Sequence, residues 1–272
     1  MSDQYAIIGN PVAHSKSPLI HMAFARQTGQ DLVYGRLLAP EGAFVATANA
    51  FRAGGGRGLN VTLPFKGEAF RFATELSERA RAARAVNTLK FEGDAIIADN
   101  TDGVGLVNDL VGNLRCAIAN RRILLLGAGG AARGVIEPLL HQNPAQLVLA
   151  NRSLEKARLL AQSFHRAFEA CSYAALAGRQ FDLVVNATSA SLAGELPPLP
   201  PMVFARGALA YDMMYGKGET PFLAFARSEG AALLADGLGM LVEQAAESFF
   251  IWRGLRPDSA PVLKLLRQAQ DA

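Results

Sequence analysis

The sequence is poor in cysteine, in long apolar runs and in clustered charge. Cys116 and Cys171 are its only cysteines, and they form neither a metal-binding nor a redox spacing, which suits a reducing compartment. No uninterrupted apolar run approaches the roughly 20 residues of a membrane-spanning helix, and no charged-then-apolar leader precedes Tyr5. Lysine and arginine exceed aspartate and glutamate by only 27 − 24 = 3, without a dense basic run. These absences predict a cytoplasmic protein that binds neither membranes nor nucleic acids.

The composition is that of a globular α/β protein. Half of the 272 residues are apolar and 19% are charged, and the length allows two domains that each bury a core. Apolar runs typical of strands alternate with helical patterns along the whole chain, and no internal repeat interrupts them. The mild positive charge is compatible with a site for small anions.

A glycine-rich turn joins a predicted strand at 123–126 to a small-residue helix. Gly127 can adopt backbone angles that other residues avoid, and Gly129 lets a pyrophosphate approach the main chain. Ala132 lets the helix pack closely on the strand. The free N–H groups of the first helical turn would then face the phosphates. Such turns often only connect elements, but the strand before and the helix after favour a dinucleotide site.

The next predicted strand, 146–150, indicates which dinucleotide is bound. An acidic residue after this strand would bind the free 2′-hydroxyl of NAD. The sequence instead has Asn151, Arg152 and Ser153, with Lys156 one turn further on. Cationic side chains match a 2′-phosphate, and they are disfavoured at an ordinary helix start by the helix dipole. The segment therefore predicts NADP.

Two serines follow the first predicted strand, 4–8. Pro18 stands where a helix would begin, and Ser17 is a natural N-cap for it. In one interpretation Ser17 only caps the helix and Ser15 is solvated. In the other, both hydroxyls bind a carboxylate. The local sequence alone favours the first interpretation.

Further polar residues gather near the ends of predicted strands. A strand at 58–62 carries Asn60 and Thr62 and is expected to end at Lys66 after the break at Pro64. A predicted hairpin, 85–91 with 96–99, has a second polar group near its ends, formed by Asn87, Thr88, Asn100, Thr101 and Asp102. Such positions are typical of ligand sites in α/β folds. Spacing alone does not distinguish a catalytic lysine at position 66 from a solvated one.

Taken together, these fragments resemble the shikimate dehydrogenase family, in its NADP-dependent biosynthetic branch. The matching motifs extend over nearly the whole chain: GNPVAHSKSP at 9–18, NVTLPFK at 60–66, AVNTL at 85–89, DNTDGVG at 99–105, GAGGAARGV at 127–135, NRS at 151–153, NATSA at 186–190, YDMMYGKGETPFL at 211–223 and DGLGMLVEQAA at 236–246. The resemblance implies reversible reduction of 3-dehydroshikimate to shikimate by NADPH, in aromatic amino-acid biosynthesis.

The resemblance also implies roles for particular residues. Lys66 matches the acid/base lysine of the family and Asp102 its partner carboxylate. Ser15 and Ser17 match hydroxyls that bind the substrate carboxylate, which reverses the local preference above. Other substrate contacts are implied for Asn60, Thr62, Asn87, Tyr215 and Gln244. Cofactor contacts are implied for Glu78, Gly127, Ala128, Gly129, Gly130, Ala131, Asn151, Arg152, Ser153, Lys156, Thr188, Met213, Gly237 and Met240. No metal is implied.

The expected architecture follows from the same resemblance. An N-terminal α/β substrate domain, residues 1–101, is completed by residues 237–272. A Rossmann-type NADP-binding domain, 102–236, is inserted between these two parts. We expect a cleft between the domains whose closure brings Lys66 towards the nicotinamide. The chain is expected to act as a monomer or a homodimer.

Two alternative functions follow from particular residues. A quinate/shikimate dehydrogenase that uses NAD would keep the fold, but Ser15, where that alternative favours a threonine, and the missing acidic residue at 151–153 oppose it. A protein that senses NADP without catalysis would lack the catalytic pair. Because Lys66 and Asp102 are both present, the sequence favours the enzyme.

Overall fold

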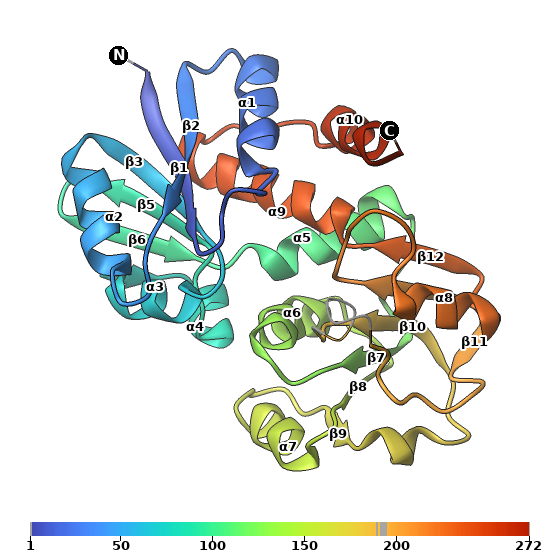
Figure 1. Cartoon of the computed structure of the whole chain (residues 1–272). Coiled ribbons are helices and arrows are strands. Elements are labelled where there is room, and N and C mark those ends of the chain that lie inside the picture. The colour runs from blue at the N-terminus through green and yellow to red at the C-terminus, as the bar shows by residue number, and fades with distance from the viewer. Residues whose placement is uncertain (1, 189, 191–194, 272) are drawn as a thin grey trace. The chain divides into compact units, whose positions relative to one another are not determined.

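The chain forms two compact units in a computed structural model that describes residues 2–188, 190 and 195–271 (Figure 1). The first unit comprises Met1–Gly105 and Leu241–Leu265, and the second comprises Leu106–Met240 and Leu266–Ala272. Each unit is built around its own six-stranded sheet. The α/β class predicted from the sequence is therefore confirmed.

The first unit packs helices against a mixed sheet with the strand order β2-β1-β3-β5-β6-β4. Strand β1 is parallel to β2 and β3, whereas β5 is antiparallel to β3 and β6. Its elements are β1 (Asp3–Gly9), α1 (Ser17–Thr28), β2 (Leu32–Leu38), α2 (Phe44–Ala53), β3 (Gly56–Val61), α3 (Lys66–Phe72), β4 (Glu75–Leu76), α4 (Glu78–Ala83), β5 (Thr88–Glu92) and β6 (Ala95–Asp99). Helices α5 (Asp102–Asn108), α9 (Leu238–Arg253) and α10 (Ala260–Asp271) contribute residues to both units.

Two local predictions in the first unit are wrong. Strand β3 ends at Val61, and Lys66 begins helix α3 instead of ending a strand. The strand prediction extended too far because α3 has only seven residues and no clear helical periodicity. Ser17 is not a cap either, since α1 begins at Ser17 itself after Lys16. The hydroxyl of Ser15 accepts a hydrogen bond from the Ser17 N–H at 3.2 Å and so takes over part of the capping role.

The second unit is built around a fully parallel sheet with the order β12-β11-β10-β7-β8-β9. Its elements are β7 (Arg122–Leu126), α6 (Gly130–His141), β8 (Gln146–Ala150), α7 (Leu154–Gln162), β9 (Glu169–Cys171), β10 (Phe181–Asn186), β11 (Phe204–Asp212), α8 (Pro221–Ser228) and β12 (Leu233–Asp236), with a short π-helix, η1 (Asp109–Asn113), and a short 3₁₀-helix, η2 (Tyr173–Leu176). The predicted strand at 146–150 coincides with β8. The three-residue strand β9 was not predicted.

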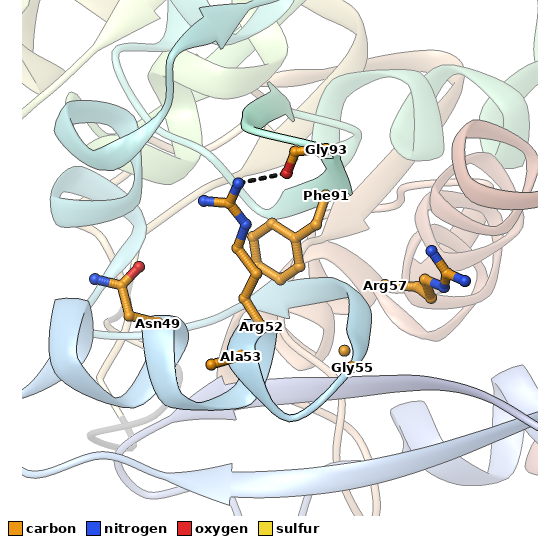
Figure 2. A pocket seen from close by; sticks show the side chains of 8 residues that line it. Asn49, Arg52, Ala53, Gly55, Arg57, Phe91 and Gly93 are labelled. Carbon is orange, nitrogen blue, oxygen red and sulfur yellow. Dashed lines mark hydrogen bonds between the residues drawn. The ribbon is translucent and has the colours of Figure 1, made fainter.

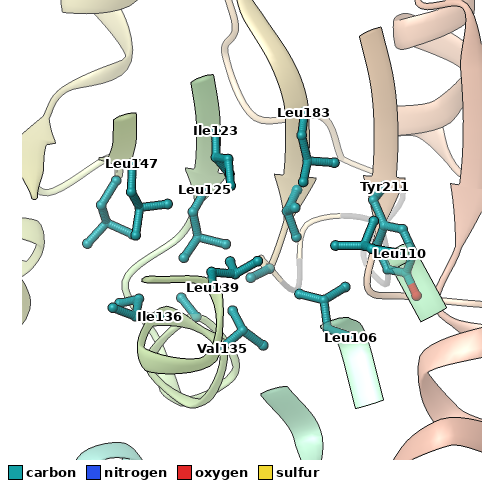
Figure 3. Packing of buried hydrophobic residues seen from close by; sticks show 14 of the residues in the cluster. Leu106, Leu110, Ile123, Leu125, Val135, Ile136, Leu139, Leu147, Leu183 and Tyr211 are labelled. Atoms are coloured by element: carbon teal, nitrogen blue, oxygen red, sulfur yellow. The ribbon is translucent and has the colours of Figure 1, made fainter. Parts of the chain in front are cut away.

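Both faces of the second sheet are covered by apolar packing. In β7, Ile123 and Leu125 pack into one buried cluster, whereas Leu124 and Leu126 pack into another on the opposite face. Figure 3 shows the first cluster, in which side chains of β7 and β8 point toward the residues of α6, whereas Tyr211 of β11 lies beside Leu110 of η1. A parallel strand buried on both faces needs a continuous apolar run, and RILLL supplies one.

The described residues contain neither a membrane-spanning helix nor a metal-binding cluster. Among them no helix has the length and hydropathy needed to cross a membrane. The same part of the chain holds no cluster of three or more His, Cys, Asp or Glu residues with the geometry of a metal site.

Candidate active site

Lys66 and Asp102 form a close ion pair in the first unit. The Lys66 Nζ donates to Asp102 Oδ2 at 2.6 Å, and the two side chains are 28% and 15% exposed. Lys66 is the first residue of α3, where the helix dipole disfavours a cation, so the lysine does not serve helix stability. Asp102 is the first residue of α5, where the dipole favours an anion. The pair thus combines a fixed carboxylate with a partly exposed ammonium group.

Asn87 holds the other oxygen of this carboxylate. Its Nδ2 donates to Asp102 Oδ1 at 2.8 Å and to Thr101 Oγ1 at 2.9 Å, and its Oδ1 accepts from the Thr101 N–H at 2.9 Å. A main-chain donor on one side and a carboxylate on the other fix the orientation of the amide. Gln244 Oε1 lies 3.3 Å from the same Nδ2, which brings α9 to this cluster.

Asn60 lies deeper in the first unit and is 5% exposed. Its Oδ1 accepts from the Tyr34 hydroxyl at 2.7 Å. Its Nδ2 donates to Asn87 O and to Ser248 Oγ, each at 3.1 Å. The amide therefore has protein partners at both ends. Ser248 and Thr88 were not predicted as site residues, since a serine in a helix and a threonine in a strand carry no local signal.

Ser15 and Ser17 lie in the turn after β1 and at the start of α1, and Thr62 directly follows the neighbouring strand β3. Ser17 is buried and Ser15 is half-buried, and Arg36 donates to the Ser15 main-chain oxygen at 2.7 Å. Thr62 follows β3, and its N–H donates to Ile8 O at 3.0 Å. A Cβ on Gly9 would lie 2.4 Å from Thr62 Cγ2, so glycine is needed there for the close approach. Among the described residues, no hydrogen bond links Ser15, Ser17 or Thr62 to Lys66.

The glycine turn of the second unit has the conformation expected for phosphate binding. Gly127 has φ +101°, and Gly129 precedes α6 without a side-chain cap. The first-turn N–H groups of α6 are therefore not capped by a side chain. Beside the turn is a hollow of about 210 Å³, and its lining consists of Ala128, Gly129, Asn151, Arg152, Ser153 and Lys156. The structure thus brings together the two segments that the sequence assigned to one nucleotide.

A second group of predicted cofactor residues lies at the carboxyl ends of β10, β11 and β12. Buried Asn186 and Asp212 organise it, because Asn186 Nδ2 donates to Asp212 Oδ1 at 3.1 Å and Asn186 Oδ1 accepts from the Thr188 hydroxyl at 2.7 Å. The Met213 N–H donates to Asn186 O at 3.0 Å. Neither Asn186 nor Asp212 was predicted as a site residue, although both end strands.

The remaining predicted residues of the second unit lie close to these strand ends. A Cβ on Gly237 would be 2.2 Å from Met213 O, so only glycine fits there. Met240 is buried in the first turns of α9. Tyr215 is half-buried, and burial, assisted by the charge of Asp236, raises the pKa of its hydroxyl.

Two predictions fall outside these groups. Glu78 is exposed at the first position of α4, in the first unit, whereas the other predicted cofactor residues are in the second unit. In the motif at 186–190, Ser189 lies outside the described residues.

A larger open hollow in the first unit contains none of the predicted residues. Figure 2 shows it, with Arg52 near the Phe91 ring and Arg57 on the far side. Arg52 donates to the Gly93 main-chain oxygen, and Arg57 donates to Asp3 Oδ1 at 3.3 Å. Both guanidinium groups are thus already paired within the protein, and the hollow offers no acid/base group.

The parallel sheet, the glycine turn and the basic segment after β8 define a Rossmann-type dinucleotide-binding protein with a second α/β unit. Models of three shikimate dehydrogenase domains match the chain: the substrate binding domain over residues 7–89, shikimate / quinate 5-dehydrogenase over 109–193 and the C-terminal domain over 237–267. The chain belongs to the shikimate dehydrogenase family. The resemblance seen in the sequence motifs is confirmed.

Individual relatives agree with this assignment. The chain is 62% identical to the shikimate dehydrogenase (NADP(+)) of Nitrosospira multiformis over 99% of its own length and 98% of the relative. A crystal structure of an Ael1 enzyme from Pseudomonas putida has 52% identity and a TM-score of 0.94, covering 97% of this chain and 98% of the other. The Thermus thermophilus shikimate 5-dehydrogenase in complex with NADP(H) and shikimate has 30% identity and a TM-score of 0.87, covering 98% and 99%.

Proposed function

We propose that this chain catalyses the reversible NADPH-dependent reduction of 3-dehydroshikimate to shikimate. The observation that carries the proposal is the Lys66–Asp102 pair at 2.6 Å, oriented by Asn87, in a chain 62% identical to a shikimate dehydrogenase (NADP(+)). An ammonium group fixed beside a carboxylate is a suitable proton donor to an oxygen that gains negative charge. The lysine stands at a helix start, where the helix dipole disfavours a cation.

Lys66 acts as the acid in the reduction. NADPH, when bound, supplies the hydride that reduces the ketone carbon. Lys66 Nζ donates a proton to the ketone oxygen and so completes the new hydroxyl group. Asp102 accepts a hydrogen bond from the same Nζ and holds the lysine in place. In the reverse direction, neutral Lys66 takes the hydroxyl proton.

The substrate is recognised by side chains whose types match a carboxylate and several hydroxyls. Ser15 and Ser17 bind the carboxylate, and Thr62 binds a ring hydroxyl. The proposal also gives ring-hydroxyl contacts to Asn87, Tyr215 and Gln244. A buried polar group left without its substrate partner costs free energy, so an analogue that lacks a hydroxyl is rejected. Asn60 has a structural role at this site, because its amide is already hydrogen-bonded to Tyr34, Asn87 and Ser248.

The second unit holds NADP. The hollow beside the glycine turn fits an adenosine 2′-phosphate, because Arg152 and Lys156 line it together with the main chain of Gly129. The N-terminus of α6 binds the pyrophosphate through Gly127–Ala131. Thr188, Met213, Gly237 and Met240 contact the nicotinamide end, and Glu78 remains an additional proposed contact.

We also propose a binding role for each unit and a cellular location for the protein. We assign substrate binding to residues 1–101 with 237–272, and NADP binding to residues 102–236. The family model that matches residues 7–89 is described as a substrate binding domain, which supports the first assignment. We further propose a cytoplasmic location and a monomer or homodimer, without a metal ion. The free thiols of Cys116 and Cys171 fit a reducing compartment.

The test is a steady-state assay with the purified chain. We expect 3-dehydroshikimate to drive NADPH oxidation, and shikimate to drive NADP⁺ reduction. Quinate in place of shikimate and NAD⁺ in place of NADP⁺ should both give lower kcat/KM. Binding of both substrates without turnover would refute the proposal, and a preference for quinate with NAD⁺ would change the assigned substrate and cofactor.

A further inference from the structure

A chain of buried hydrogen bonds leads from Tyr34 to Asp102 in the first unit. It passes through Asn60, Ser248, Thr88 and Asn87, which are all at most 5% exposed. We call these five residues, from Tyr34 to Asn87, the buried relay. Its members come from β2, β3, α9 and β5 and from the residue before β5. Nothing in the proposed reaction uses Tyr34, Ser248 or Thr88 directly.

The two amides of the relay have fixed orientations. Asn60 Nδ2 faces the main-chain oxygen of Asn87 at 3.1 Å, so this end must be the donor and Oδ1 must accept from Tyr34. Asn87 Oδ1 accepts from the Thr101 main-chain N–H at 2.9 Å, so its Nδ2 must face Asp102 Oδ1. Partners of unambiguous donor or acceptor type decide both orientations.

These orientations constrain the hydroxyl protons between them. Asn87 Oδ1 can only accept, so its contact of 2.9 Å with Thr88 Oγ1 uses the Thr88 proton. The contact of 2.7 Å between Thr88 Oγ1 and Ser248 Oγ then uses the Ser248 proton, which also faces Gln244 O at 3.0 Å. Ser248 Oγ in turn accepts from Asn60 Nδ2 at 3.1 Å. With the Thr88 proton on Asn87 Oδ1 and the Ser248 proton on Thr88 Oγ1, every bond of the relay runs toward Asp102.

A relay of this kind has consequences for the carboxylate at its end. Hydrogen bonds in series polarise one another, and a buried donor or acceptor that loses its partner is costly. Thr88 supplies one of the donors that keep Asn87 Oδ1 turned away from Asp102. Without that donor the Asn87 amide is held less firmly, and Asp102 is less well placed to orient Lys66.

We propose that Thr88 and Ser248 are positioning residues for the Lys66–Asp102 pair, acting through the Asn87 amide. The inference rests on the proposed function, because it assigns the catalytic role to Lys66. It adds two residues, 160 positions apart in the sequence, that touch neither substrate nor cofactor. Because Thr88 and Ser248 fix the geometry of the Lys66–Asp102 pair, their loss should lower kcat more than it weakens substrate binding.

The first test measures steady-state kinetics of Thr88→Val, which keeps the shape of the side chain and removes the hydroxyl. We expect kcat for 3-dehydroshikimate reduction to fall on the order of tenfold, with the KM for NADPH unchanged and the KM for 3-dehydroshikimate changed much less than kcat. Thr88→Ser should restore most of the loss, and Ser248→Ala should show a smaller loss of the same kind. Thr28→Val is the matched control, because it removes a hydroxyl that bonds to Phe24 O in the same unit, outside the relay. Its kcat should equal that of the unaltered chain.

The second test does not depend on activity. Amide hydrogen exchange of the Asn87 side chain, followed by NMR, should be slow in the unaltered chain and faster on the order of tenfold in Thr88→Val. Unaltered kcat and unaltered exchange in a folded Thr88→Val protein would overturn the relay while leaving the proposed function intact. If the unaltered chain itself lacks activity, the proposed function fails, and the exchange measurement still decides whether Thr88 fixes the amide.

Discussion

The two units build their sites by different means. In the first unit the predicted site consists of side chains that are bonded to one another, as in the cluster of Lys66, Asp102, Asn87 and Gln244. In the second, the glycine turn offers main chain, and Arg152 and Lys156 are exposed beside it. A site of mutually bonded side chains is sensitive to loss of any one member, whereas a main-chain site is sensitive to added bulk. The following experiments test this contrast, beginning with the largest expected effect.

Lys66→Ala tests whether the side-chain network carries the chemistry. We expect kcat to fall about a thousandfold, because a general acid contributes roughly two to four orders of magnitude. NADPH affinity, measured by fluorescence titration, should not change, because the proposed NADP site lies in the second unit. Lys90→Ala is the control, since Lys90 is also 28% exposed and ion-paired in the first unit. Activity retained in Lys66→Ala would remove the lysine from the mechanism.

Gly237→Ala tests the sensitivity of the second unit to added bulk. The new Cβ would meet Met213 O at 2.2 Å, and a main-chain atom cannot move aside cheaply. We expect the free energy of unfolding to fall by about 2 to 3 kcal/mol, and NADPH binding to weaken as the strand ends shift. Denaturant unfolding would measure the first effect. Gly216→Ala is the control, because its Cβ would meet no described atom within 4 Å, and equal stability losses in both variants would contradict the explanation.

His21→Phe tests the pH sensitivity expected of a buried polar core in the first unit. The imidazole is 1% exposed, stacks on Tyr34 at 4.4 Å and, among the described residues, has no hydrogen-bond partner for either nitrogen. Burial lowers its pKa from 6.5 to about 3, against a weaker opposing effect of Asn60. As the pH falls below 6.5 the unfolded chain takes up a proton that the folded chain refuses, so this stabilisation is complete above pH 6.5 and is lost towards pH 3.

The pKa difference of His21 also sets how much the free energy of unfolding should change with pH. Between pH 7 and pH 5 the unaltered chain should lose about 2 kcal/mol of unfolding free energy through His21, at roughly 1.4 kcal/mol per pH unit. His21→Phe should show a flatter curve over the same range. Urea unfolding at both pH values measures the difference, and parallel curves for the two proteins would show that His21 is not the cause.

Arg152→Ala combined with Lys156→Ala should give the smallest effect, because both side chains are exposed. We expect the KM for NADPH to rise about tenfold, with little change for NADH, since only NADPH carries the 2′-phosphate. The difference should shrink at high salt. Arg158→Ala is the control, because Arg158 lies on α7 together with Lys156 but does not line the hollow. Equal changes for NADPH and NADH would contradict the phosphate assignment.

Much of the fold was predictable because its signals are local. Strand β8 is an apolar run bounded by polar residues, and its predicted limits match the structure. Strand β9, Glu169–Cys171, is too short for any periodicity and is defined only by its pairing with β8. Ser17 illustrates a different difficulty, since a good capping residue is also a good first-turn residue. In the structure the Ser15 hydroxyl accepts from the Ser17 N–H, and Ser17 is the first residue of the helix instead of its cap.

The sequence by itself determined the family, the use of NADP and the glycine turn. The turn was readable because strand, glycines and helix are contiguous, and because the backbone freedom of Gly127 depends on its own lack of a side chain. Only the tertiary structure decided which polar side chains meet. Asn60 and Ser248 are 188 positions apart, and their hydrogen bond exists because α9 packs against the sheet of the first unit. A contact of that kind depends on the packing of the whole unit, and no local pattern encodes it.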